Sequence, residues 1–357
     1  MKENSYFYGL DFLRAILMLV GVLIHYVSMT SPYDEWRYHS YFHENVYIYH
    51  LIYFTHFFRM ETFFLLAGFF SLLLCDKRGK NNFLENRKQR VLKPLVFSCL
   101  TVSTLSFMLI YYIYREGEVT LNNIIMHFWF LLTLFIISLI FFVSRFYLKI
   151  INKDFKVVFF CSFILLMALL FIRFIFVRFF PTDTFVFQAF NYFLFNTLYF
   201  GVFFLIGWLL YSRRNSIHVF FTRKTYIISA IVLCVASSAY LNYYALEVEP
   251  LNIYQIFFSR SVEVLTSLVA SVGLFLVFYD LKIYGNVIRY LVNSSIVVYI
   301  FHVPYLIAFG FIFDGYILND VVYFFCVVSC TYLLSFLTYE VMKRNRFLCS
   351  IYGLKYQ

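Results

Sequence analysis

Ten stretches of about 20 apolar residues, separated by short polar segments, constrain the fold more than any other feature of the sequence. An α-helix needs about 20 residues to cross the roughly 30 Å hydrocarbon core of a bilayer, and a helix satisfies its own backbone hydrogen bonds there. We therefore expect an all-α, polytopic integral membrane protein of about ten transmembrane helices. The stretches run over about residues 10–29, 50–75, 93–114, 126–143, 157–179, 192–211, 226–244, 254–279, 290–310 and 321–342.

The composition excludes a water-soluble globular protein. The chain is 62% hydrophobic and 13% charged, whereas soluble domains are about 45–50% apolar and about 25% charged. A net charge of +10 would suggest nucleic acid in a soluble protein. Here the basic residues lie between apolar stretches, so the charge indicates topology instead. The loops are short, so we expect a single membrane-embedded domain over residues 1–357 and no fused soluble domain.

The distribution of Lys and Arg orients these helices. With the N-terminus inside, the outer segments hold only Arg37 and Arg115, and the inner segments hold most of the 29 Lys and Arg residues. Cytoplasmic loops of membrane proteins carry such an excess. We therefore predict that both termini are cytoplasmic. The longest inner loop is expected at about residues 76–92 and is strongly basic.

The first helix carries a polar stripe. Asp11, Arg14, Met18, Gly21 and His25 are spaced by three or four residues, so they share one helix face. At about 1.5 Å per residue, Arg14 lies roughly 16 Å below His25. The structural interpretation is that Asp11 and Arg14 form an i, i+3 pair and that His25 bonds a neighbouring helix. The functional interpretation is a site on this face, and the spacing leaves both open.

Further ionisable residues lie within the apolar stretches, where a charge costs at least about 2.5–3.5 kcal/mol near a helix centre. Arg59 and Glu61 are two residues apart, so they must point toward different helices. Arg260 and Glu263 are three apart and can form a local ion pair, which is their structural alternative. A polar cavity open to the outside is expected, because one level holds His25, His56, Arg59, Glu61, His127, Arg260, Glu263 and His302.

Five segments, in order along nearly the whole chain, resemble the acyltransferase-3 family of membrane O-acyltransferases. They are YGLDFLRAILMLVGVLIHY with Arg14 and His25, FRMETFFLLAGFF, NRKQRVLKPLVF with an Arg-x-x-Arg pair at Arg87 and Arg90, HFWFLLTLF, and SSIVVYIFHVPYL with Tyr299, His302 and Pro304.

The resemblance implies transfer of an acyl group, most often acetyl from cytoplasmic acetyl-CoA, to a hydroxyl of an extracytoplasmic glycan. It implies a multi-pass protein of the bacterial inner membrane that modifies lipopolysaccharide O-antigen or another surface polysaccharide. Acetyl-CoA is then a donor substrate and no cofactor is permanently bound. Arg14, Arg87, Arg90 and Lys93 are expected to bind the donor.

His25 is the expected general base, because imidazole exchanges protons near neutral pH. Glu61 and His302 complete the expected catalytic set, with Glu61 or Glu263 orienting His25 and His302 stabilising the oxyanion or binding the acceptor. Arg59, His127, Arg260 and Glu263 are expected to bind the acceptor substrate.

Two alternatives stay open. The acyl group can be succinyl, transferred to a periplasmic glucan. The chain can be a transporter or flippase of a lipid-linked sugar, in which buried charges line a pathway. His39 and His43 are four residues apart, but no third ligand follows at a usual metal spacing, so we predict no metal site.

Overall fold

The computed structural model describes residues 7–33, 43–114, 120–143, 154–217, 224–247 and 252–356. Within these residues every regular element is a helix, and ten helical segments are long and apolar enough to cross a membrane. The prediction of an all-α polytopic membrane protein with ten spanning helices is therefore confirmed. Some positions used in the charge and metal arguments lie outside the described residues: Lys2, Arg37, His39, Arg115, Arg145, Lys149, Lys153 and Arg223.

Six of the ten segments are single helices: α1 (Tyr8–Met29), α10 (Phe155–Phe179), α14 (Lys224–Glu247), α15 (Ile253–Tyr279), α16 (Asn286–Phe313) and α17 (Asp320–Met342). The other four are interrupted. The second comprises α2 (Val46–Tyr53), η1 (Phe54–Phe57) and α3 (Arg59–Arg78). The third comprises α4 (Lys80–Arg87), η2 (Lys88–Leu92), α5 (Lys93–Ser98), η3 (Cys99–Ser103) and α6 (Thr104–Tyr114). The fourth comprises α7 (Leu121–Ile125), η4 (Met126–Phe128) and α8 (Trp129–Val143), and the sixth α11 (Phe185–Ala189), η5 (Phe190–Phe195) and α12 (Asn196–Ser212). A short turn, η6 (Arg214–Ser216), and a final helix, α18 (Arg346–Tyr352), lie beyond the spanning segments.

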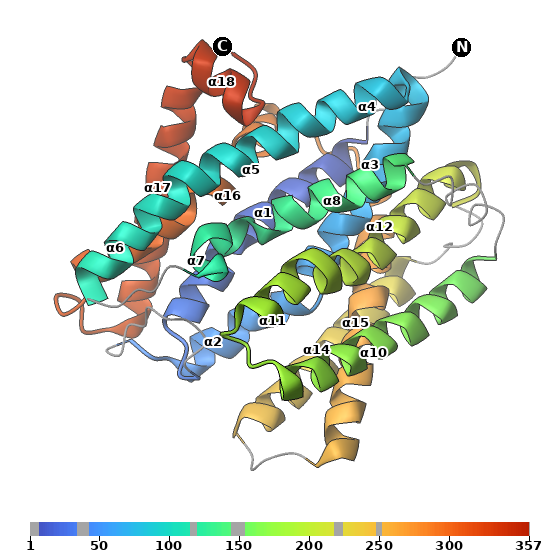
Figure 1. The fold of residues 1–357 in the computed structure, drawn as a ribbon, viewed down its shortest axis with the longest axis horizontal. Helices are drawn as coiled ribbons and strands as arrows, with labels where there is room; N and C mark the ends of the chain where they lie inside the picture. The colour runs from blue at the N-terminus through green and yellow to red at the C-terminus, as the bar shows by residue number, and fades with distance from the viewer. Residues whose placement is uncertain are drawn as a thin grey trace.

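The predicted basic loop over residues 76–92 is wrong in its conformation. The chain turns only at Gly79, whose φ of 80° suits glycine, and is then helical through α4 and the π-helical turn η2. Lys, Arg, Glu and Gln are good helix formers, and the helix also buries Phe83 and Val91, which are 1% and 4% exposed. The basic residues therefore lie on a rigid helix. In Figure 1, α4 and α18 lie at the same end of the bundle, which the charge distribution assigns to the inside.

A very close helix contact joins α3 and α12. A Cβ atom placed on Gly68 would lie 2.0 Å from the Phe204 carbonyl oxygen, and one on Gly207 would lie 1.9 Å from that of Leu65. Only glycine allows backbones to approach so closely, and membrane helices commonly pack through small residues for this reason. Phe64 and Phe200 stack beside this contact with ring centroids 4.6 Å apart. Both helices contribute buried residues to the larger apolar core.

Replacing Gly207 by alanine is expected to destabilise the protein by about 1–3 kcal/mol, because the new methyl group forces α3 and α12 apart. At Gly201, on the same helix, nothing lies within 4 Å of the position that a Cβ atom would take. Gly201→Ala is therefore the matched control and should leave stability unchanged or slightly higher. The stability of both variants is measured as the apparent melting temperature in detergent. Equal melting temperatures for the two variants would show that Gly207 is not needed for the close approach of α3 and α12.

Candidate active site

Three histidines from three separate elements meet in the outer half of the bundle. His25 comes from α1, His127 from η4 and His302 from α16. The ring centroids are 5.0 Å apart for His25 and His302, 5.1 Å for His127 and His302, and 6.0 Å for His25 and His127. His127 and His302 are buried and His25 is half-buried. The fold thus brings together three histidines that lie about 100 to 280 residues apart in the sequence.

A proline in α16 positions the second of these rings. Pro304 has no backbone N–H, so the carbonyl of Ile300, four residues earlier, receives no helical hydrogen bond from it. His127 Nε2 lies 3.1 Å from that carbonyl oxygen. The ring of His127 therefore satisfies a backbone acceptor that the proline released.

The backbone around His127 is strained and is held in place by α16. Met126, directly before it, has a φ of 45°, which is strained for a non-glycine residue and ends the α7 helix. The Tyr299 hydroxyl donates a hydrogen bond to the His127 carbonyl. A strained residue persists only where its surroundings over-determine it, and here α16 supplies that constraint. The geometry of η4 therefore depends on α16.

These contacts assign the proton positions of two rings. His302 Nδ1 lies 2.7 Å from the Tyr299 carbonyl oxygen, and His127 Nε2 faces the Ile300 carbonyl. A carbonyl oxygen only accepts, so each of these nitrogens must carry the proton. The other nitrogens, His302 Nε2 and His127 Nδ1, are buried and have no hydrogen-bond partner among the described residues. Each neutral ring therefore retains a lone pair for a ligand.

Arg59 reaches the same region from α3. A Cβ atom on Gly21 would lie 2.6 Å from Arg59 Nη1, so the guanidinium covers α1 one turn before His25. Arg59 also interacts electrostatically with His25. Its side chain is buried, and its Nε has no hydrogen-bond partner in the described part of the chain. The glycine in the polar stripe of α1 therefore makes room for a buried cation.

Glu61 points elsewhere, as the two-residue spacing predicts. It is buried and interacts with Tyr199 on α12 and with Glu263 on α15. Glu263 pairs with Arg260 at 2.6 Å, which is the local ion pair that the sequence allows. Arg260 and Glu263 also line a cavity of about 90 Å³ with Phe57, Ser238, Asn242, Ala245, Ile256 and Ser259. The structure thus groups Glu61, Arg260 and Glu263 on the α12–α15 side, away from the α1 stripe.

A second cluster lies at the inner end. Arg14 pairs with Asp11 at 2.8 Å, and both Arg87 and Arg90 interact electrostatically with Arg14. Arg87 lies over the Phe83 ring at 5.0 Å, and its enclosed Nε has no hydrogen-bond partner among the described residues. Three neighbouring guanidinium groups repel one another unless an anion joins them. The cluster is therefore a candidate anion site.

The π-helical turn η2 and the chain end set the position of Arg90. Such turns occur frequently at functional sites, and Lys93 begins α5 directly after this one. Gly353, in the left-handed conformation at the end of α18, approaches so closely that a Cβ atom there would lie 3.1 Å from Arg90 Cγ. The stem of Arg90 is thus packed against the C-terminal turn. The sequence predicts Arg90 and Lys93 as donor-binding residues but gives no signal for this contact with α18.

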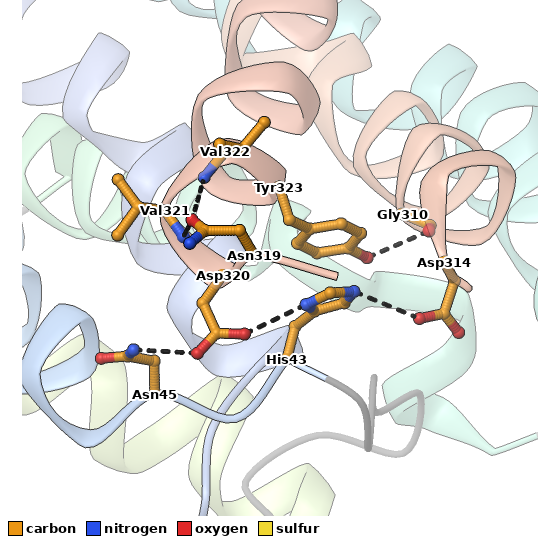
Figure 2. Close-up of polar contacts among 9 residues, drawn as sticks. All are labelled: His43, Asn45, Gly310, Asp314, Asn319, Asp320, Val321, Val322 and Tyr323. Carbon is orange, nitrogen blue, oxygen red and sulfur yellow. Dashed lines mark hydrogen bonds and ion pairs between the residues drawn. The ribbon is translucent and has the colours of Figure 1, made fainter. Parts of the chain in front are cut away.

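His43 belongs to a different kind of site (Figure 2). Its Nδ1 lies 3.2 Å from Asp320, its Nε2 lies 3.8 Å from Asp314, and its ring stacks on Tyr323 at 3.8 Å. Asn45 donates to the other oxygen of Asp320. Because both ring nitrogens face carboxylates, neither is available as a base. His43 therefore ties the start of α2 to the α16–α17 connection, and no group of three metal-ligating side chains occurs among the residues described.

Replacing His43 by alanine is expected to cost about 1–3 kcal/mol of stability, because Asp320 loses a buried hydrogen-bond donor and Tyr323 loses the ring stacked on it. The expected result is a lower apparent melting temperature in detergent. Leu318→Ala is the control, since Leu318 lies in the same connection and is 89% exposed. A His43→Ala variant that melts with the wild type would show that these contacts do not stabilise the outer end.

Comparison with known proteins identifies the family of the chain. Residues 7–340 match the acyltransferase domain of the acyltransferase-3 family. No curated protein and no solved structure matches the chain. The matched range includes all three clustered histidines and the three inner arginines, whereas α18 lies beyond it. Because the match covers nearly the whole chain, the protein belongs to the acyltransferase-3 family and is a membrane acyltransferase.

Proposed function

We propose that this acyltransferase moves an acetyl group from cytoplasmic acetyl-CoA to a hydroxyl of an extracytoplasmic glycan, with His25 as general base. The observation that carries the proposal is the arrangement of two clusters along α1: an arginine group in which Arg14 and Arg87 are half-buried and Arg90 is exposed, and a largely buried histidine group. Arg14 marks an anion site near the inner end, and His25 marks a group of basic nitrogens in the outer half. A bacterial inner-membrane location and a surface polysaccharide such as O-antigen follow from this proposal.

The inner cluster suits the phosphates of coenzyme A. Guanidinium groups bind phosphate through charge-assisted and often bidentate hydrogen bonds. Arg87 and Arg90 would hold the nucleotide end, with Lys93 beside them. Arg14, on the same helix as His25, would lie further along the donor toward the pantetheine arm. Acetyl-CoA is in this scheme a substrate and not a resident cofactor.

The outer cluster suits the transfer step. His25 removes the proton of the sugar hydroxyl as its oxygen attacks the thioester carbonyl carbon. The tetrahedral intermediate then collapses, its C–S bond breaks, and the leaving thiolate takes the proton from His25. The products are free coenzyme A and the acetyl ester of the sugar.

Residues near His25 would stabilise the oxyanion and bind the acceptor. The intermediate carries an oxyanion, which needs hydrogen-bond donors. Arg59 is permanently protonated, lies beside the α1 stripe and has a donor to spare. Neutral His302 and His127 offer acceptors instead, so they suit the hydroxyl groups of the incoming sugar. Glu61, with Arg260 and Glu263, would contact the acceptor further toward α15.

His25→Ala is expected to abolish glycan acetylation while leaving the amount of protein in the membrane unchanged, because only the base is removed. The measurement is NMR of the purified polysaccharide beside an immunoblot of the membranes. His43→Ala, whose ring does not serve as a base, should retain a measurable rate per folded molecule. Full O-acetylation in the His25→Ala strain would overturn the assignment of the base.

The double variant Arg87→Ala/Arg90→Ala is expected to weaken acetyl-CoA binding by on the order of 10²- to 10⁴-fold, since each of the two lost charge-assisted bonds is worth about 1.5–3 kcal/mol. Titration of the purified protein with acetyl-CoA and with succinyl-CoA measures this loss and identifies the preferred acyl group. Arg344→Ala is the control, because Arg344 is a basic residue near the inner end and is 74% exposed. Wild-type protein that binds neither thioester would favour transport of a lipid-linked sugar instead.

A further inference from the structure

We propose that α2 and η1 form an aromatic track for the acceptor polysaccharide, and that the track begins at a sugar-binding subsite between α2 and α14. The identity of the ligand rests on the proposed function. The site itself rests on a cavity, a hydrogen-bonded triad and a series of stacked rings, none of which belongs to the histidine or arginine clusters.

The cavity lies at the outer ends of α2 and α14. Its volume is about 670 Å³, and it is lined by Val46, Tyr47, His50, Leu51, Tyr243 and Glu247. Tyr47 and Leu51 are 86% and 71% exposed. The lining thus combines flat aromatic surfaces with an imidazole and a carboxylate.

A hydrogen-bonded triad fixes the polar part of this lining. The Tyr33 hydroxyl contacts both the Glu247 carboxylate and His50 Nε2, the latter at 3.0 Å. Its single proton goes to the carboxylate, which can only accept, so His50 Nε2 donates to the Tyr33 oxygen. The triad joins the residues after α1 to α2 and α14, so the cavity has a preorganised wall.

Stacked rings continue from this cavity toward the histidine cluster. Tyr49 is buried and meets the His50 ring edge-on at 5.1 Å, and it stacks on Tyr53 at 4.8 Å, so it supports the track from behind. Tyr53 is half-buried and stacks on the exposed His56 at 5.2 Å, and these two rings form the accessible surface. His56 has an exposed side chain and interacts electrostatically with His25. Three residues later, Arg59 covers α1 beside the proposed reaction site. The track therefore connects the outer surface with the place where a hydroxyl would be acetylated.

The chemistry of the lining selects a sugar. A pyranose ring presents apolar C–H faces that stack on aromatic rings, and its hydroxyl edge bonds to carboxylate, imidazole and phenol groups. A lipid chain would need a uniformly apolar lining, whereas this one contains His50 and Glu247. Tyrosines that merely anchor a helix at the membrane interface would not need a carboxylate-bridged wall.

The test compares two acceptors prepared from the cell-surface polysaccharide after mild alkaline de-O-acetylation: the long chain and its single repeat unit. For Tyr47→Ala and Tyr243→Ala, the expected result is a KM for the long chain raised at least tenfold. The KM for the single repeat unit, kcat and acetyl-CoA binding should stay at wild-type values. Tyr47→Phe retains the ring and should restore the KM, which separates loss of stacking from misfolding.

Tyr316→Ala is the matched control, since Tyr316 is 87% exposed and lies in the α16–α17 connection. If Tyr47→Ala and Tyr316→Ala lower membrane levels equally and leave every KM unchanged, the rings act as interface anchors and the track is overturned. It is also overturned if KM rises equally for long and short acceptors. Failure of the proposed function is distinct, because wild-type protein would then acetylate neither acceptor.

Discussion

The structure depends on the absence of water in the bilayer core, where every backbone hydrogen-bond group must find a partner within the protein. Each break in a spanning helix therefore creates a polar atom that another element has to satisfy. Pro304 releases the carbonyl of Ile300, and His127 bonds to it from η4. Met126 ends α7 at a strained φ of 45°, and Tyr299 bonds to the next carbonyl. These two helix interruptions leave backbone groups to be satisfied, and the contacts that satisfy them bring His127 and His302 together beside His25.

At the other end of α1 it is charged side chains, and not backbone groups, that need partners. Arg14, Arg87 and Arg90 interact with one another, and Asp11 supplies a nearby carboxylate. The helix α4 and its π-helical turn hold Arg87 and Arg90 on a rigid frame, and the glycine turn after α18 packs against the stem of Arg90. A rigid cluster of like charges is costly without an anion. The inner cluster is therefore a candidate anion site, whereas His43 pairs with two aspartates that flank its ring.

Much of this arrangement could be predicted from the sequence, and the reasons differ between residues. The stripe of Asp11, Arg14, Gly21 and His25 follows from helical periodicity, and the Arg260–Glu263 pair follows from a three-residue spacing. The divergence of Arg59 and Glu61 follows from their two-residue spacing. By contrast, the loop predicted at residues 76–92 is a helix, because basic side chains that indicate a cytoplasmic segment are equally compatible with helical backbone. The contact of His43 with Asp314 and Asp320 joins positions about 270 residues apart, which no local pattern encodes.

The sequence by itself determined the number of spanning helices and the residues that are costly to bury, and it predicts the direction of the helices. It could do so because the bilayer sets helix length, and the excess of Lys and Arg marks the inner side. Only the tertiary structure decided which costly residues meet. The rotation and tilt of each membrane helix depend on its packing neighbours, as the glycine contact between α3 and α12 illustrates. That packing directs Arg59 to α1 and Glu61 to α12, and it gathers three distant histidines into one candidate active site.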